Sequence, residues 1–285
     1  MSVIGRLARL TGQVIPAALA RPFGQPTAVF FHGVERRIND PALQVNQHSL
    51  DAFEAMARLL KRDFDVLPLA AIDEVLEHPQ RHSRALFLMS DDGYANLDTI
   101  AAPVLRGLDL PWTLFVSTHH IDSGDFTPPT LTRVFFLEAP AGRYDLPHLT
   151  PFELDDRESL SVECWKQLKN MDATQAGETL AALRKVLDAT GIDLKKRYAS
   201  ETFLSWDQVR ALHRQGVEIG AHADWHWAMH EHQPPEWLRD QAGRSKGRVE
   251  AETGPGRCFA YPFGQREDVG RGAWQAVREA GFDCA

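Results

Sequence analysis

The chain has 285 residues, enough for one large or two medium-sized domains, and 44% of them are hydrophobic, as in ordinary soluble enzymes. Its formal net charge of −8 argues against a nucleic-acid-binding surface, which would be basic, and gives no general attraction to anionic lipid. Because Cys164, Cys258 and Cys284 are widely spaced and odd in number, the sequence predicts neither a disulfide framework nor a cysteine-based zinc site. We expect each cysteine to be a small buried residue.

Residues 1–24 differ in character from the rest of the chain. Apolar side chains recur there at helical spacing with arginines between them, namely Ile4, Leu7, Ala8 and Leu10 with Arg6 and Arg9. The pattern predicts a basic amphipathic segment that packs on the domain or rests on a membrane surface. Its apolar stretch is too short for a typical secretory signal, and no run approaches the ~20 apolar residues of a membrane span. We therefore predict a cytoplasmic protein, with peripheral membrane contact as an option and export as the less favoured alternative.

Strands and helices alternate from Thr27 onward. Apolar runs predict strands at residues 27–31, 85–89, 112–116, 217–220 and 258–261. Helical spacing predicts helices at residues 49–60, 69–76, 96–106, 206–214, 235–253 and 269–280, with Ser49, Asn96 and Ser205 at their starts. This alternation indicates an α/β fold in which parallel strands are joined by right-handed crossovers. A β/α barrel would then carry its active residues at the strand ends.

The alternation breaks at about residues 120–204. Prolines mark a loop-rich section there, at positions 128, 129, 140, 147 and 151, and charged helices follow near residues 158–170 and 175–189. We interpret this stretch as a helical insertion within one domain of residues 25–285 rather than as a separate domain. Its charges are expected to face solvent, although the insertion could also form a lid or a wall of the substrate site.

Two adjacent carboxylates follow the strand at residues 85–89. Side chains alternate along an extended strand, so Asp91 and Asp92 should point in different directions, and one could bind a metal while the other faces a substrate. Gly93 has no Cβ and allows the backbone to turn sharply. On its own, however, Asp-Asp-Gly is equally typical of a simple turn.

A histidine pair follows the strand at residues 217–220. His222 and His226 are four residues apart and can converge on one ion, and a single carboxylate would complete a three-ligand site with a position open for water. Their unprotonated imidazoles suit zinc, cobalt or nickel. The alternative is a pair of solvated histidines in a loop that also holds His230 and His232. Together with the strand-end aspartates, the pair predicts a divalent metal, most of all zinc, held by Asp92, His222 and His226.

These motifs resemble those of the polysaccharide deacetylases, the NodB-homology family or carbohydrate esterase family four. That family's Thr-Phe-Asp-Asp-Gly motif is matched at residues 89–93, its His-Ser/Thr-x-x-His motif at residues 222–226, and its Arg-x-Pro-Tyr motif approximately at residues 260–264. The resemblance runs from about Thr27 to the C-terminus. It implies a distorted barrel of about seven parallel strands, here with a helical insertion.

The resemblance also implies an activity and roles for residues. The chain would remove N-acetyl groups from amino sugars of a polysaccharide or glycan precursor, with Asp91 as the general base. The backbone N–H of Phe263 would stabilise the oxyanion, and Trp225, Trp227 or Tyr261 could stack on a sugar ring. His32, at the end of the first strand, would be the general acid, because a first-strand histidine lies in the active site of circularly permuted members. Core packing remains an ordinary alternative for Tyr261, as a structural role does for His32.

Two departures keep other functions open. Ser90 stands where the family has an aromatic residue, and Ala260 replaces the arginine that orients the base in many members. A deformylase or another amide hydrolase acting on a lipid-linked amino sugar would use the same metal chemistry. A non-catalytic carbohydrate-binding or scaffolding domain with a degenerate site is the alternative from a different class. The sequence makes no prediction of oligomeric state.

Overall fold

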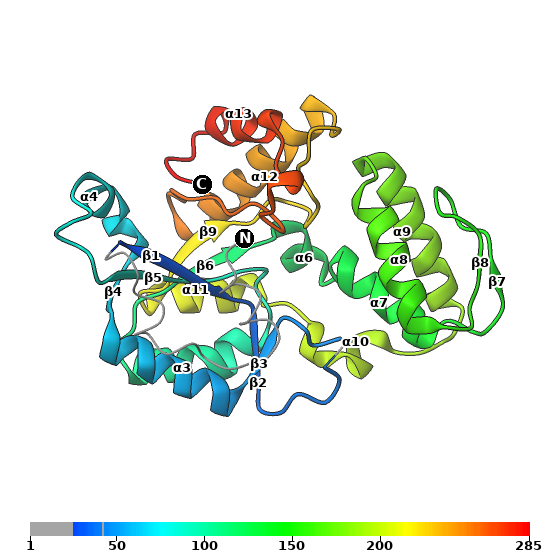
Figure 1. Ribbon diagram of the computed structural model, residues 1–285, viewed down its shortest axis with the longest axis horizontal. Helices are drawn as coiled ribbons and strands as arrows, with labels where there is room; N and C mark the ends of the chain where they lie inside the picture. The colour runs from blue at the N-terminus through cyan, green and yellow to red at the C-terminus, as the bar shows by residue number, and fades with distance from the viewer. Residues whose placement is uncertain (1–24, 42) are drawn as a thin grey trace.

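A computed structural model describes residues 25–41 and 43–285 of the chain (Figure 1). Its main element is a parallel sheet in the order β1-β5-β6-β9, with β4 paired to the beginning of β5. The strands are β1 (Thr27–Phe31), β4 (Asp65–Leu67), β5 (Ala85–Ser90), β6 (Thr113–Val116) and β9 (Glu218–Ala221). The sequence analysis predicted four of these strands, β1, β5, β6 and β9, but it did not predict β4. The amphipathic segment expected at residues 1–24 lies outside the described residues.

Parallel pairing brings the carboxyl ends of the central strands to one edge of the sheet. In the register, Ser90 of β5 lies beside Leu114 of β6, and Val116 of β6 lies beside Ala221 of β9. The residues that follow β5 and β9 therefore emerge close together, which is the usual location of ligand sites in open α/β sheets. Beyond β9 the sheet continues as isolated parallel bridges from Ala221 to Phe259 and from Cys258 to Cys284.

The helices around the sheet agree with the sequence patterns. They are α3 (Leu50–Asp63), η1 (Leu69–Ala71) with α4 (Ile72–Glu77), α11 (Trp206–Arg214), α12 (Pro235–Thr253) and α13 (Arg271–Glu279). The Ser49 side chain accepts a hydrogen bond from the N–H of Ala52 at the start of α3, as an N-cap should. Ser205 and Gln208 form a reciprocal capping box at the start of α11. In Figure 1, α12 packs between β9 and α13.

The expected N-cap at Asn96 is wrong. The helix there begins with a wide turn, η2 (Leu97–Ala101), and continues as α5 (Ala102–Gly107), without a capping bond from Asn96. The Asn96 side chain instead accepts from the N–H of Val34 and donates to Gln47 and Glu35, at 3.2, 2.6 and 2.9 Å. It thereby joins the loop that follows β5 to a small parallel pair, β2 (Gly33–Glu35) and β3 (Gln47–Ser49).

The insertion forms a helical layer beside the sheet, at the right of Figure 1. It contains α6 (Thr118–Ser123), α7 (Pro128–Glu138), the hairpin β7 (Arg143–Tyr144) and β8 (Phe152–Glu153), α8 (Arg157–Lys169), α9 (Ala173–Asp188), α10 (Leu194–Arg197) and η3 (Ala199–Glu201). The two expected charged helices correspond to α8 and α9. The section around Pro128 and Pro129 is a helix rather than a loop, because proline fits the first turn of a helix. A hydrophobic cluster separate from the sheet core fills the layer.

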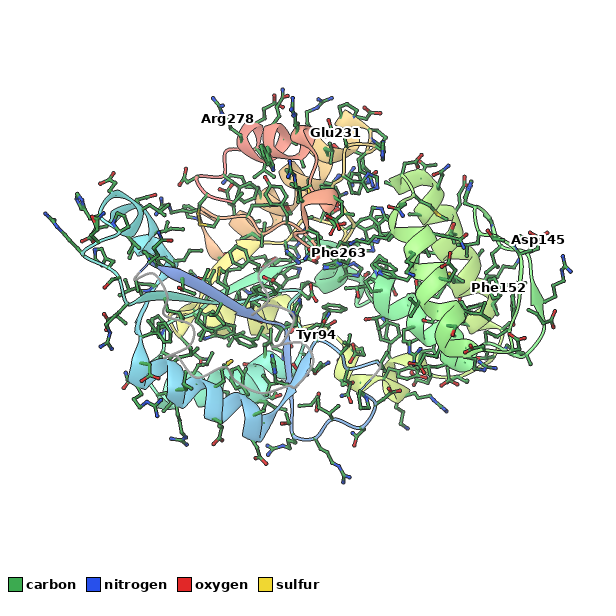
Figure 2. All side chains as sticks on the ribbon, in the orientation of Figure 1. Tyr94, Asp145, Phe152, Glu231, Phe263 and Arg278 are labelled. Carbon is green, nitrogen blue, oxygen red and sulfur yellow. A yellow bond between two sulfur atoms is a disulfide. The ribbon has the colours of Figure 1, made fainter. Side chains whose placement is uncertain are left out.

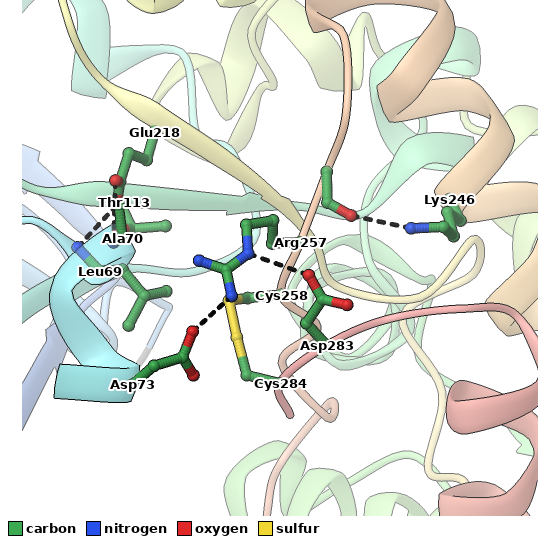
Figure 3. The surroundings of a disulfide bond; sticks show 11 residues. Leu69, Ala70, Asp73, Thr113, Glu218, Lys246, Arg257, Cys258, Asp283 and Cys284 are labelled. Carbon is green, nitrogen blue, oxygen red and sulfur yellow. Dashed lines mark hydrogen bonds and ion pairs between the residues drawn. A yellow bond between two sulfur atoms is a disulfide. The ribbon is translucent and has the colours of Figure 1, made fainter. Parts of the chain in front are cut away.

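Two cysteines form a disulfide that the sequence analysis did not predict. Cys258 and Cys284 are bonded, with Cα atoms 4.7 Å apart, while Cys164 is buried with a free thiol as expected (Figure 3). Their separation of 26 residues gave no local signal, and the parallel bridge between the two positions brings them together. In the described part of the chain no helix combines the length and apolarity needed to cross a membrane.

Candidate active site

Asp92, His222 and His226 meet at the carboxyl edge of the sheet. Oδ1 of Asp92 lies 3.1 Å from Nε2 of His226 and 3.4 Å from Nε2 of His222. All three side chains are buried, and each offers an atom to one common point. The structure therefore brings together the three residues expected to bind a metal, although their sequence positions are far apart.

The backbone that carries these side chains is in an uncommon conformation. Asp92 and Ala223 have φ angles of 71° and 60°, in the left-handed region that residues with a Cβ rarely adopt. Gly93 follows at φ 91°, and a Cβ built there would lie 3.1 Å from Cδ1 of Ile121. Strained residues of this kind persist where the surrounding fold fixes them, and they cluster at functional sites. The turns aim Asp92 and His222 at each other.

A hydrogen bond from the third motif orients His222. Its Nδ1 lies 2.9 Å from the carbonyl oxygen of Ala260, which can only accept, so Nδ1 carries the proton and Nε2 is left as a free ligand atom. The N–H of Ala260 in turn donates to the carbonyl of Ala221 at 2.8 Å. Residue 260 thus acts through its backbone, and the loss of the family's arginine leaves this contact intact.

The three side chains fit a divalent metal ion. Oδ1 of Asp92 and Nδ1 of His226 are buried without a hydrogen-bond partner, and an unpaired buried carboxylate oxygen is costly. Nitrogen and oxygen ligands in a tetrahedral zinc site lie ~3.3 Å apart, given bonds of roughly 2.0–2.1 Å. The separations of 3.1 and 3.4 Å agree with this spacing. Burial raises the pKa of Asp92, but His226 and His222 outweigh it and hold that pKa well below its usual value.

Asp91 lies beside this group without joining it. Its N–H donates to the carbonyl of Phe31 at 3.0 Å, and its carboxylate is half-buried. Burial raises the pKa of Asp91, and His222 and His32 offset only part of that rise. Within residues 25–41 and 43–285 no cationic side chain forms an ion pair with Asp91, as expected from the absence of arginine at position 260. A carboxylate with a raised pKa is a stronger base, which suits proton abstraction.

The comparison with protein families identifies the fold around this site. The polysaccharide deacetylase family model matches residues 78–285, which is well over half of the chain. The chain belongs to the polysaccharide deacetylase family. It is therefore a hydrolase of amide C–N bonds, as the motifs indicated. No curated protein sequence matches this deacetylase.

Solved structures similar to the deacetylase agree with this assignment. The deacetylase PplD of Streptococcus pyogenes, in complex with acetate, is 12% identical with a TM-score of 0.56, covering 91% of this chain and 81% of its own. The de-N-acetylase from Aggregatibacter actinomycetemcomitans is 15% identical with a TM-score of 0.54, and the match covers 90% of this chain and 86% of the de-N-acetylase. IcaB from Ammonifex degensii is 14% identical with a TM-score of 0.55, and the match covers 90% of this chain and 82% of IcaB. At these identities the likeness concerns the fold, and the expected α/β barrel class is confirmed. The number of strands stays a prediction.

His32 of the deacetylase lies at the end of β1, next to the aspartate turn. Its carbonyl accepts a hydrogen bond from the Ser90 hydroxyl at 3.0 Å, which explains how a small polar residue fits the buried position 90. Its ring packs edge-on against Phe30, with centroids 5.8 Å apart. Among the described residues the His32 imidazole has no hydrogen bond to either aspartate, so its role as general acid stays a prediction.

The sequence analysis missed another buried histidine, His120, which lies next to His226 of the deacetylase site. Nδ1 of His120 donates to the carbonyl of Asp125 at 2.9 Å, and its Nε2 accepts from the N–H of His226 at 3.4 Å. Burial lowers the pKa of His120 to about 3, which keeps its ring neutral and able to accept. His120 lies shortly after the end of β6. A polar residue close to a strand end, the pattern that pointed to Asp91, could therefore have pointed to His120 as well.

The end of the insertion pairs with the aspartate turn of the deacetylase. Leu204 N–H donates to the carbonyl of Gly93 at 2.9 Å, and Ala95 N–H donates to the carbonyl of Thr202 at 2.8 Å. Between them the rings of Tyr94 and Phe203 stack with centroids 5.4 Å apart. The turn is therefore fixed from outside its own segment.

The aromatic residues expected to contact sugar have different surroundings. Tyr261 is half-buried and packs against Phe259, with ring centroids 5.1 Å apart. Phe263 lies near the centre of the molecule, between the sheet and the insertion (Figure 2), and its ring meets His226 at 4.7 Å. Trp227 is fully buried and belongs to the core, while Trp225 stacks on it at 5.5 Å and stays half-buried. The structure thus places the Phe263 ring against His226 of the candidate metal site, whereas the Tyr261 ring packs on Phe259.

Proposed function

We propose that this deacetylase uses a divalent metal, zinc in the first place, to remove N-acetyl groups from amino sugars of a polysaccharide or glycan precursor. The observation that carries the proposal is the meeting of Asp92, His222 and His226, in which Oδ1 of Asp92 is buried without a hydrogen-bond partner. Cobalt or nickel would suit the same imidazole and carboxylate ligands. Two similar structures, a deacetylase in complex with acetate and a de-N-acetylase, support this substrate class.

The residues around the site divide the reaction between them. Bound zinc would polarise the amide carbonyl and make water a stronger nucleophile near neutral pH. Asp91 would take the proton of the attacking water, and His32 would give a proton to the amine as the C–N bond breaks. The products are acetate and a free amino group on the sugar. The Phe263 N–H has no acceptor in the described part of the chain, so it is available to the oxyanion.

Removal and return of metal test the proposal. The purified protein, treated with a chelator, should lose activity on an N-acetylglucosamine oligomer and regain it with zinc, cobalt or nickel. The Asp91→Asn variant should keep its metal and lose about 10²–10⁴-fold in kcat, the usual contribution of general base catalysis. Full activity after complete metal removal would refute metal dependence, and full activity of Asp91→Asn would refute the base assignment.

The second candidate is a deformylase or another amide hydrolase that acts on a lipid-linked amino sugar. The same buried ligands would serve it, because the metal chemistry does not depend on the acyl group. Product analysis separates the two, since release of acetate supports the first function and release of formate the second. A protein that binds sugar but releases neither product would support the non-catalytic reading.

The cellular location stays a prediction. The sequence favoured the cytoplasm, whereas the disulfide between Cys258 and Cys284 favours an oxidising compartment, because such bonds are rare in the cytosol. Cell fractionation, with a thiol assay of the recovered protein, decides between the two. Binding to anionic vesicles before and after deletion of residues 1–24 tests the expected peripheral membrane contact.

A further inference from the structure

Helix α8 of the insertion reaches the loop that follows the third motif. Nζ of Lys169, near the end of α8, lies 2.7 and 2.8 Å from the two carboxylate oxygens of Asp268. The Asp268 side chain is 4% exposed and that of Lys169 is 25% exposed, so the pair is largely removed from solvent. The same Nζ lies 4.9 Å from the ring centroid of Phe263. One lysine thus contacts two parts of one loop.

Asp268 ties the far end of this loop together. Its Oδ2 accepts a hydrogen bond from the N–H of Gln265 at 3.3 Å, and its own N–H donates to the carbonyl of Gln265 at 2.9 Å. The carboxylate therefore has partners on the loop and on the insertion at the same time. Because the pair is shielded from water, the ionic contact is stronger than a surface salt bridge.

The near end of the loop is in a conformation that needs support. Phe263 and Gly264 have φ angles of 66° and 63°, and the first of these is unfavourable for a residue with a Cβ. The Phe263 ring is held by His226 at 4.7 Å, by Trp165 of α8 at 5.6 Å, and by Lys169. Two of these three contacts, those of Trp165 and Lys169, come from α8 of the insertion. The barrel without the insertion would lack them.

We propose that Lys169 is a positioning residue for the deacetylation reaction. Through Asp268 and the Phe263 ring it holds the 262–268 loop against His226, so that the Phe263 N–H stays directed at the developing oxyanion. The inference rests on the proposed function, and it makes the insertion a part of the active site rather than a solvated appendage. Among the described residues Lys169 forms no hydrogen bond or ion pair with Asp92, His222 or His226, so it would act through the loop.

The test compares two lysine variants of the full-length, zinc-loaded protein. Lys169→Met keeps the length of the side chain over Phe263 but removes its charge, whereas Lys166→Met makes the same change at an exposed lysine of the same helix. We expect Lys169→Met to lower kcat by about 10–100-fold with KM changed by less than about threefold, since loss of an oxyanion donor costs about 10²–10³. Lys166→Met should match the wild type.

Metal content and a rescue variant separate positioning from general unfolding. Both lysine variants should bind zinc in the same amount as the wild type, because the ligands Asp92, His222 and His226 are untouched. Lys169→Arg should restore most of kcat, because a guanidinium also pairs with a carboxylate and stacks on an aromatic ring. If Lys169→Met does not fold, Asp268→Asn, which removes the partner charge at constant size, should show the same selective fall in kcat.

Three outcomes would overturn the inference. They are a kcat of Lys169→Met within about twofold of the wild type, a loss of activity that follows loss of zinc, and a fall in kcat that Lys166→Met shares. A wild-type protein that releases no acetate from an N-acetylglucosamine oligomer would instead refute the proposed function. The two failures are therefore distinguishable in one set of assays.

Discussion

Replacing Glu201 by glutamine should stabilise the protein above neutral pH and should flatten the dependence of its stability on pH. Glu201 lies at the end of the insertion and is 2% exposed. Its Oε1 accepts hydrogen bonds from Gln47 at 2.8 Å and from the Ser200 hydroxyl at 3.1 Å. Burial raises the pKa of Glu201 to about 7, because those two contacts do not replace the lost solvation and Asp92 repels its charge further.

The size of the effect follows from this pKa. Between the ordinary value of 4.5 and about 7 the folded state binds a proton at Glu201 that the unfolded state has released. Stability is therefore fully supported by this group below about pH 4.5 and falls as the pH rises through about 7. The difference corresponds to about 3 kcal/mol, at about 1.4 kcal/mol for each pH unit. A neutral amide at position 201 does not ionise, and its oxygen can still accept from Gln47.

Urea unfolding of the wild type and of Glu201→Gln, at steps from about pH 5 to about pH 8, measures the effect. The variant should gain up to about 3 kcal/mol over the wild type across this range. Glu77→Gln, at an exposed carboxyl, is the matched control and should follow the wild type. If the difference between Glu201→Gln and the wild type stays within about 0.5 kcal/mol at every pH, the reasoning from burial is refuted.

Three further changes test the metal site, the disulfide and a helix cap. Asp92→Asn should abolish zinc binding, seen as loss of the stabilisation of about 2.7 kcal/mol that zinc at 100 times its Kd gives the wild type; zinc retained in full would contradict the ligand assignment. Cys258→Ser should lower stability by about 3 kcal/mol, given a loop of 26 residues. Equal stability of the wild type with and without reductant would count against the bond. Ser205→Ala should cost about 1 kcal/mol in thermal unfolding with kcat unchanged, and an unaltered melting curve would show that the capping box is unimportant.

The sequence allowed most strands, most helices and the meeting of Asp92, His222 and His226 to be predicted, because each has a local signal. Apolar runs such as residues 85–89 are buried on both faces of a parallel sheet, and the polar residues that follow them must then lie at its carboxyl edge. Ser49 and Ser205 announce helix starts through hydrogen bonds made within a few residues. The distance along the chain between the aspartate and the histidines did not matter, since both motifs end strands of one sheet.

The parts that could not be predicted depend on contacts between remote segments. Asn96 is a residue type that often caps helices, but its side chain forms hydrogen bonds with Val34 and Gln47, which are distant in sequence. Lys169 and Asp268 look like ordinary surface charges, and only folding brings them within 2.7 Å. The cysteine pair is of the same kind. Such contacts decide the details of the site, whereas local patterns decide its location.

The pairing of residues 202–204 with the turn at Gly93 has a consequence for the order of folding. The turn is short, but the segment that pairs with it, residues 202–204, is synthesised only after α7, α8 and α9. Contacts between such distant segments are slow to close, because chain entropy must be lost before they form. In a nascent chain the group formed by Asp92, His222 and His226 should therefore assemble late, after the helical layer has docked. Pulse-labelled chains halted before residue 202 offer a direct way to follow that sequence of events.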